Sequence, residues 1–183
     1  MPLALLCLAL APGAASADEY AKLLLDKSRV EFTAKQMNVP TDGAFKRFKA
    51  QIALDPASPQ TGTARIDVEP ASWDAGLAEV NEEMLGKNWF DAKQFPTASF
   101  VSTSVKALGG DRYEARGKMT MKGKTRDVVA TFLAKPQGTN LVLTGSFPLK
   151  RLDYGVGTGT WGDTDIVADE VQVKFQFVLA QGK

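Results

Sequence analysis

Apolar and polar residues alternate with a period of two along most of the chain. Val30, Phe32 and Ala34 alternate with polar residues, and the same pattern returns from Val171 to Leu179. A period of two is typical of strands that bury one face. It predicts eight strands, over residues 29–35, 48–54, 64–69, 98–106, 113–121, 126–135, 140–147 and 171–179.

Turn-forming residues separate these segments. They are Pro40-Thr41-Asp42-Gly43, Asp55-Pro56, Gly109-Gly110-Asp111, Lys122-Gly123-Lys124 and Gln137-Gly138. Glycine, proline, asparagine and aspartate favour turns because they adopt or stabilise conformations that strands avoid. The connections are too short for crossover helices, so consecutive strands are expected to pair antiparallel. The predicted fold class is an all-β antiparallel meander.

One segment departs from this alternation. Between residues 74 and 85 the apolar side chains fall at helical spacing. Ser72 or Asp74 is placed to cap the start of a helix, and Gly86 is placed to end it. We therefore expect a short helical insertion in the β domain.

The first residues have the pattern of a secretory signal peptide. Residues 3–11 are apolar, and small residues follow, with Ala15 and Ala17 at the positions that a signal peptidase favours. The run is too short to span a membrane as a helix. We expect a signal peptide over 1–17 and one domain over 18–183, the alternative being an unstructured N-terminal tail. Cleavage would remove Cys7, the one cysteine.

Eight strands with one apolar face each bury those faces in a two-sheet sandwich or in a closed barrel. An eight-stranded barrel is either filled by side chains or holds one small ligand. A membrane barrel shows the same alternation. Here, charged residues lie along the polar faces and the predicted helix interrupts the series, which favours a barrel in water without stable membrane insertion.

The composition excludes several common functions. The 183 residues include 22 Lys+Arg, 21 Asp+Glu and no histidine, for a net charge of +1. A Ser-His-Asp triad is therefore impossible, and no global field attracts nucleic acid. The acids at 163, 165, 169 and 170 lack the spacing of a calcium loop, and no helix follows the Gly-x-Gly-x-x-Gly at 157–162. We expect no metal and no catalytic cofactor.

Several short motifs follow one another in a fixed order along the chain. They are Asp26-Lys27-Ser28-Arg29-Val30-Glu31-Phe32, Phe45-Lys46-Arg47-Phe48, Asn88-Trp89-Phe90-Asp91 with Phe95-Pro96-Thr97-Ala98-Ser99-Phe100, Gly117-Lys118-Met119-Thr120-Met121-Lys122-Gly123-Lys124-Thr125, Arg151-Leu152-Asp153-Tyr154-Gly155-Val156 and Asp169-Glu170-Val171. In this order they resemble the motifs of the YceI family of lipid-binding, lipocalin-like barrels. Lys46 replaces the glycine usual in the second motif, and a Gly-rich stretch after Tyr154 is a further departure.

The resemblance implies an eight-stranded lipocalin-like barrel in the periplasm that carries a long isoprenoid lipid. The ligand would be a polyprenyl lipid or a ubiquinone-type quinone, and family members tend to form homodimers. Enclosing an apolar tail gains about 25 cal/mol per Å² of apolar surface, without any acid, base or nucleophile. The missing histidine agrees with such a non-catalytic carrier.

Large apolar residues on the inward faces are the candidate ligand contacts. Plain core packing is the alternative for each of them. Trp161 is placed to close the mouth of the barrel, and Arg151 either pairs with Asp153 or holds a ligand head group. The candidates are Phe32, Phe48, Ile52, Met84, Trp89, Phe90, Phe100, Met119, Phe132, Phe147 and Trp161.

Two other functions remain open at the level of the sequence. One is a cavity enzyme, an isomerase or hydrolase that uses carboxylates or Tyr113 and Tyr154. It requires an acid on an inward face, whereas Glu31, Asp67 and Glu69 fall on polar faces. The other is a structural envelope protein with a filled barrel. A cavity inside the barrel would separate it from a carrier.

Overall fold

All strands of the described chain form one antiparallel sheet, in a computed structural model that describes residues 19–182. The strands are β1 (Tyr20–Leu23), β2 (Arg29–Gln36), β3 (Val39–Phe45), β4 (Phe48–Ala53), β5 (Thr63–Val68), β6 (Trp73–Asp74), β7 (Ala98–Gly109), β8 (Arg112–Met121), β9 (Lys124–Gln137), β10 (Asn140–Lys150) and β11 (Glu170–Gln181). Within 19–182 there is one α-helix, α1 (Ala78–Glu83), and the 3-10 turns are η1 (Leu25–Lys27), η2 (Pro59–Thr61), η3 (Pro70–Ser72), η4 (Arg151–Tyr154) and η5 (Gly159–Gly162). The predicted signal peptide lies outside the described residues.

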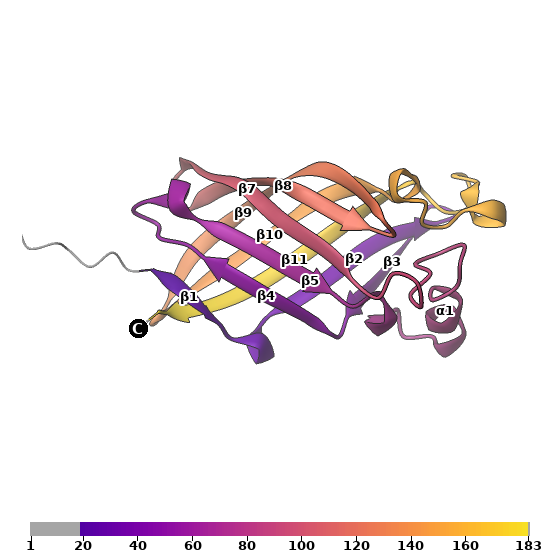
Figure 1. The fold of residues 1–183 in the computed structure, drawn as a ribbon, viewed down its shortest axis with the longest axis horizontal. Helices are drawn as coiled ribbons and strands as arrows, with labels where there is room; N and C mark the ends of the chain where they lie inside the picture. Colours follow the sequence, from indigo (N-terminus) through magenta and orange to yellow (C-terminus); the bar gives the residue numbers. More distant parts are fainter. Residues whose placement is uncertain (1–18, 183) are drawn as a thin grey trace, which may run out of the picture.

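The sheet curls along its length into a half-barrel (Figure 1). Its strands follow the order β4-β5-β7-β8-β9-β10-β11-β2-β3-β6, and β1 pairs with β11. β1 also reaches the end of β4, because Tyr20 and Leu54 exchange two backbone hydrogen bonds of 3.0 Å each. We call the end of the molecule where β1 lies the β1 end. The α1 end lies opposite, where α1 and the loops after β10 gather (Figure 1).

The all-β antiparallel class is confirmed, but the predicted count of eight strands is not, because the sheet has eleven. The strands without a prediction are β1, β3 and β6. β1 and β6 have four and two residues, too few for a readable alternation. The first predicted strand continues back through η1 into β1, where Leu24 N–H donates to the Val178 carbonyl over 2.8 Å.

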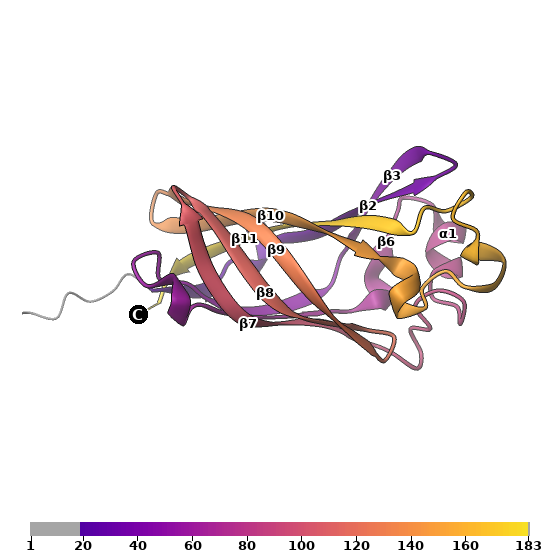
Figure 2. The ribbon, with the colours of Figure 1, turned by 90° about the horizontal axis from the view of Figure 1, so that it is seen from above.

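β3 contains the residues that predict a turn at 40–43, and that turn prediction is wrong. The chain reverses at Met37 and Asn38 instead, whose φ angles of 48° and 65° make the tight turn between β2 and β3. β3 lies near the edge of the sheet and pairs on its outer side only with the two residues of β6. Pro40 is tolerated because an edge strand does not need every N–H for pairing. Figure 2 shows this hairpin standing away from the rest of the sheet.

The helix is shorter than the predicted segment 74–85. Asp74 belongs to β6, and Gly76, with φ of 83°, turns the chain before α1. Neither Ser72 nor Asp74 caps the helix, whose N-cap residue is Leu77. The Asp74 carboxylate instead accepts hydrogen bonds from Gly76 N–H at 2.9 Å and from the Asn81 amide at 3.0 Å. The side chain thus holds the turn that precedes α1.

Two clusters of apolar side chains lie inside the curled sheet, one after the other along its length. The cluster toward the β1 end contains Leu141 and Leu179, which are 1% and 0% exposed. The cluster toward the α1 end contains Trp89, Phe90 and Tyr154. Every second residue of a strand points into the curl, which accounts for most of the first cluster. In the second cluster Trp89, Phe90 and Tyr154 come from segments outside the strands.

Candidate functional site

An apolar cavity of about 480 Å³ lies inside the curled sheet. Its wall includes residues of both apolar clusters, from Leu54 near the β1 end to Trp161 near the α1 end. The volume is in the range of sites that enclose small organic ligands, and such sites are mostly apolar. A barrel interior that remains open to this extent can accommodate a hydrophobic molecule.

Polar side chains join the wall of this cavity mainly at the α1 end. Lys35, Gln36 and Thr41 come from the hairpin of β2 and β3, and Glu79 and Glu83 come from α1. All five are exposed to solvent. We therefore place the mouth of the cavity between this hairpin and the helix.

The predicted ligand-contact residues lie in the wall of the cavity with one exception. Phe48 is not among the lining residues described; its ring packs edge-on against Phe177, which does line the cavity, with a centroid separation of 6.0 Å. The predicted residues that do line the cavity are Phe32, Ile52, Met84, Trp89, Phe90, Phe100, Met119, Phe132, Phe147 and Trp161. Their contact with a ligand stays a prediction.

Trp73 is a lining residue that the sequence did not indicate. Its indole stacks on Phe32 with a centroid distance of 3.7 Å and an angle of 14°. Phe45 and Phe90 pack around the same indole at 5.6 and 5.5 Å. Trp73 lies between the regular alternation and the helical segment, so neither period marks it as inward-facing.

Trp161 joins the loop after β10 to the helix at the mouth. Its indole N–H donates to a carboxylate oxygen of Glu83 on α1 over 3.1 Å. The same ring packs against Trp89 with a centroid distance of 5.5 Å. Gly157 and Thr158 anchor the loop because their N–H groups donate to the Asn88 carbonyl at 2.7 and 2.8 Å. The loop and the segment after α1 therefore form one connected rim.

Arg151 organises the same loop from inside. The guanidinium is only 2% exposed and lies 5.8 Å from the ring centroid of Trp89. Its N–H groups donate to five backbone carbonyls, those of Val156, Gly157, Trp161, Val167 and Ala168, at 2.5 to 3.0 Å. Burial lowers the pKa of Arg151, and the charge of Asp169 acts in the opposite direction.

The two roles considered for Arg151 from the sequence therefore need correction. The Asp153 side chain is exposed, and among the described residues no salt bridge joins it to Arg151. The guanidinium donors already bind carbonyls, so they are not free for a ligand head group. Arg151 is a structural residue that holds the loop at the mouth.

The residues considered for a cavity enzyme lie elsewhere. Tyr113 stacks on Phe132 and Tyr154 is buried in the cluster near the α1 end, and neither lines the described cavity. Burial raises the pKa of Tyr154, which opposes its ionisation. Glu31 and Asp67 form exposed ion pairs with Arg29 and Arg65. These positions give the enzyme hypothesis no acid deep in the cavity.

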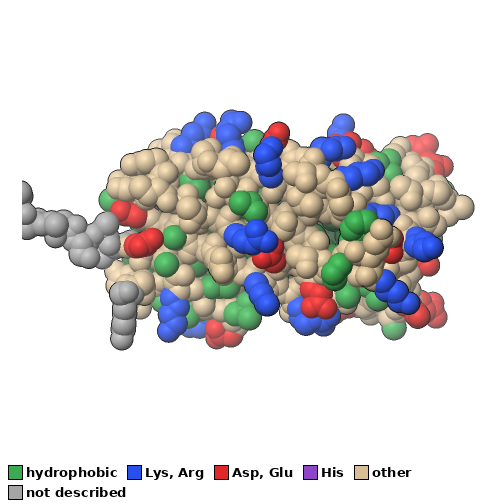
Figure 3. Space-filling view, viewed as in Figure 1, with side chains coloured by type: hydrophobic (Ala, Val, Ile, Leu, Met, Phe, Trp, Pro, Cys, Tyr) green, Lys and Arg blue, Asp and Glu red, His purple; other side chains and the backbone are tan. Residues whose placement is uncertain are grey.

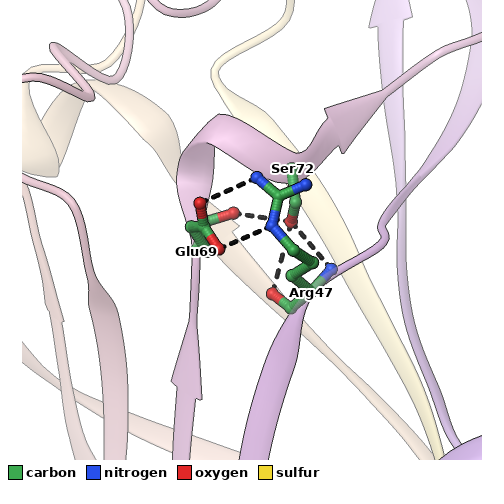
Figure 4. Close-up of polar contacts among 3 residues, drawn as sticks. All are labelled: Arg47, Glu69 and Ser72. Atoms are coloured by element: carbon green, nitrogen blue, oxygen red, sulfur yellow. Dashed lines mark hydrogen bonds and ion pairs between the residues drawn. The ribbon is translucent and has the colours of Figure 1, made fainter.

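Arg47 and Glu69 pair across the gap between β4 and β5, and Ser72 joins them (Figure 4). The guanidinium donates two hydrogen bonds of 2.7 Å to the carboxylate. Ser72 Oγ accepts a hydrogen bond from Arg47 N–H at 2.9 Å and donates to the Glu69 carbonyl at 2.7 Å. This contact fixes the bend at which the chain passes from β3 to β4.

The outer surface carries charges of both signs. Figure 3 shows Lys and Arg side chains interspersed with Asp and Glu over the visible face. Cross-strand ion pairs such as Lys118–Asp127, at 2.9 Å, account for part of this pattern. Among residues 19–182, no helix has the length and apolar character needed to cross a membrane. The same residues hold no group of three His, Cys, Asp or Glu side chains placed to bind a metal ion.

A curled antiparallel sheet around an apolar cavity defines the class of this protein as a barrel-like β fold. The chain belongs to the YceI-like domain family, whose model matches residues 22–179. It is 31% identical over 142 residues to a UPF0312 protein of Pseudomonas putida, covering 72% of this chain and 74% of that protein. A UPF0312 protein of Vibrio cholerae is 27% identical over 139 residues, covering 71% and 74%.

Solved structures agree with this assignment. BcnA of Burkholderia cenocepacia superposes with a TM-score of 0.84 at 46% identity, covering 86% of this chain and 99% of that one. A polyisoprenoid binding domain from Saccharophagus degradans has a TM-score of 0.68 at 13% identity, covering 91% and 99%. At that identity the second likeness shows a shared fold alone.

Proposed function

We propose that this protein is a non-catalytic carrier that holds the tail of a long isoprenoid lipid in its cavity. The observation that carries the proposal is the cavity itself, about 480 Å³ in volume and lined by aromatic, aliphatic and methionine side chains. Flat rings pack on isoprene units and thioethers fill irregular gaps. The Saccharophagus degradans domain of the same fold, described as polyisoprenoid binding, supports this ligand class.

The ligand is a polyprenyl lipid or a ubiquinone-type quinone. The tail lies along the apolar wall, and the head group lies at the mouth among Gln36, Thr41 and Glu79. The site of action is the periplasm, which the signal-peptide pattern of residues 1–17 supports. An apolar tail cannot cross an aqueous compartment unaided, and the cavity removes it from water.

Lipid mass spectrometry of the native protein tests the proposal. The full chain is expressed in a Gram-negative host, purified from the periplasmic fraction without detergent, and extracted with organic solvent. We expect one isoprenoid species at close to one equivalent per chain, and recovery of the protein from the periplasm. Protein that repeatedly carries no hydrophobic ligand and binds no added prenol or quinone would contradict the function.

A matched pair of variants shows whether the ligand lies in the cavity. Met119→Trp places a large ring in the wall and is expected to reduce the bound isoprenoid, whereas Val101→Trp on the outward face of the neighbouring strand is expected to retain it. Equal lipid content in the two variants would place the ligand outside the cavity.

Light scattering of the same samples measures whether the chain forms a homodimer, which stays a prediction.

A further inference from the structure

Three strand glycines lie directly beneath phenylalanine rings. A Cβ atom on Gly43 would lie 2.1 Å from Phe32 Cζ. The corresponding distances are 2.5 Å from Gly117 to Phe100 Cζ and 2.6 Å from Gly145 to Phe175 Cζ. Real Cβ atoms do not approach other atoms this closely, so no other residue fits beneath the rings as they are placed.

The strand register explains how the rings reach these glycines. Phe32 is the direct partner of Gly43 across β2 and β3, and Phe175 is the direct partner of Gly145 across β11 and β10. Phe100 pairs with Met119, two residues from Gly117 on β8. Side chains in a sheet normally stand perpendicular to it. Each of these rings instead lies across the neighbouring strand, over the bare backbone of a glycine.

This placement has a consequence for the cavity, because all three phenylalanines line it. A ring that lies along the wall occupies little of the interior, and at Phe32 the indole of Trp73 stacks on the ring and lines the cavity with it. A ring that stands upright would project toward the axis and fill it. Glycine weakens a strand, since it has no side chain to pack and loses more entropy on folding. The presence of three glycines in strands, each beneath a ring that lines the cavity, therefore needs an explanation.

We propose that Gly43, Gly117 and Gly145 keep the interior hollow and set the width of the chain that it accepts. Each glycine lets its phenylalanine lie against the wall, so the three pairs determine the capacity of the site. The accepted ligand is a flexible, narrow chain that runs along the wall to which these rings belong. The assignment of a ligand rests on the proposed function, whereas the hollowing itself does not.

Gly43 is the position at which the ring makes the closest approach to the added Cβ. The nearest atom to its added Cβ is Phe32 Cζ, the far end of a side chain, and the next is the Asp74 carbonyl oxygen at 2.7 Å. At Gly145 the nearest atom is the Thr131 carbonyl oxygen at 2.5 Å, which belongs to a central strand. A methyl group at Gly43 therefore displaces the ring of Phe32 most strongly and also presses on the Asp74 carbonyl.

The experiment compares four proteins: the wild type, Gly43→Ala, Gly43→Ala with Phe32→Leu, and the control Gly162→Ala. Gly162 has ordinary φ and no heavy atom within 4 Å of an added Cβ. The first readout is the volume change of unfolding under pressure, whose magnitude scales with the internal void lost. The second is the affinity for geranylgeraniol, measured by quenching of tryptophan fluorescence.

We expect Gly43→Ala to reduce the magnitude of the volume change and to weaken binding at least tenfold. The double variant is expected to recover part of both values, because leucine has no ring to displace while the contact with the Asp74 carbonyl remains. Gly162→Ala is expected to match the wild type. Wild-type volume change and affinity in a folded Gly43→Ala protein would overturn the proposal. If Gly43→Ala does not fold, recovery of folding in the double variant supports it. Failure of the double variant while Phe32→Leu alone folds overturns it.

The two readouts separate this inference from the proposed function. A wild type that binds no prenol contradicts the carrier function but leaves the volume comparison intact. A reduced volume change in Gly43→Ala then still supports the pairing of glycine and ring. An unchanged volume in a protein that does bind prenols contradicts the pairing alone.

Discussion

The indole of Trp161 donates a hydrogen bond to the Glu83 carboxylate, and this contact joins the loop after β10 to α1 at the mouth of the cavity. Trp161→Phe removes the donor but keeps a ring to pack on Trp89. We expect a bound prenol or quinone to dissociate several-fold faster, because a hydrogen bond to a charged group contributes about 1.5–3 kcal/mol at most and less when exposed. Stopped-flow displacement by a fluorescent lipid measures this rate.

Glu83→Gln is the matched control, since its amide oxygen can still accept the bond from Trp161. It is expected to release ligand at the wild-type rate, and Glu83→Ala at the rate of Trp161→Phe. A Trp161→Phe protein with the wild-type dissociation rate would show that the loop and helix do not limit ligand exit.

Arg151 should be one of the most sensitive positions for folding. Arg151→Met leaves five carbonyl groups without their donor, among them those of Val156 and Gly157. An unpaired buried polar group costs about 1–3 kcal/mol. Because some of these carbonyls can reach water at the loop, we expect a total loss of about 3–5 kcal/mol in the free energy of unfolding, measured by urea denaturation.

Arg151→Lys tests whether the positive charge or the donor geometry of the guanidinium stabilises the fold. Lysine keeps the positive charge but has three donors in place of five and no planar fork. We expect it to recover only part of the lost stability. Full recovery would mean that the charge near Asp169 and the ring of Trp89, rather than the set of carbonyl bonds, makes Arg151 necessary.

Ser72 is 4% exposed and satisfies the Arg47 N–H at the bend between β3 and β4. Ser72→Ala leaves that N–H without a partner, and we expect the free energy of unfolding to fall by about 1–3 kcal/mol. Ser104→Ala, on the exposed side of β7, is the control and is expected to change stability by less than about 0.5 kcal/mol. Equal effects of the two substitutions in urea unfolding would contradict a structural role for Ser72.

Acid should weaken the fold partly through Glu69. The hydrogen bond from Arg47 lowers the pKa of Glu69 below its ordinary value of 4.5. A carboxylate with a lowered pKa contributes stability above its unfolded pKa and loses it as the pH falls through the folded pKa. The stability difference between wild type and Glu69→Gln is therefore expected to be constant above about pH 5.5 and to shrink below about pH 4.5.

Urea unfolding of both proteins from pH 7 to pH 3 measures this difference. The effect is small because the pair is exposed and salt screens it. A difference that grew as the pH fell would contradict the assigned direction of the pKa shift. The carboxylates of Asp42, Asp74 and Glu114 also have lowered pKa values, so the wild type as a whole should lose stability over the same acid range.

The sequence predicted the elements that bury one regular face and missed those that do not. Strands such as β10 and β11 are more than ten residues long and alternate over most of that length, so their period is readable without neighbours. β3 is exposed over Val39–Asp42 and has no buried face there to create a pattern. Its Pro40 and Gly43 resemble a turn locally, and only the pairing with β2 shows that they lie in a strand.

The cavity wall was partly predictable for the same reason. Inward positions of long strands, such as Phe100 and Phe132, follow from alternation, and these residues line the cavity. The inward position of Trp73 could not be predicted from alternation, because the residue lies in the two-residue strand β6. It stacks on Phe32 in the wall of the cavity. Phe48 faces inward by its period but packs on Phe177, so alternation alone does not distinguish a lining ring from a packed one.

Phe48 and Phe100 provide a direct test of that distinction. Both are partly buried rings on strands of the same sheet, but only Phe100 is among the residues described as lining the cavity. Phe100→Leu is expected to change the affinity for geranylgeraniol by about fivefold or more, since one aromatic contact is worth about 1 kcal/mol. Phe48→Leu is expected to lower the free energy of unfolding by about 1 kcal/mol without changing affinity. Equal effects of the two substitutions on binding would contradict this distinction and place the ligand against Phe48 as well as along the wall that Phe100 shares with Met119.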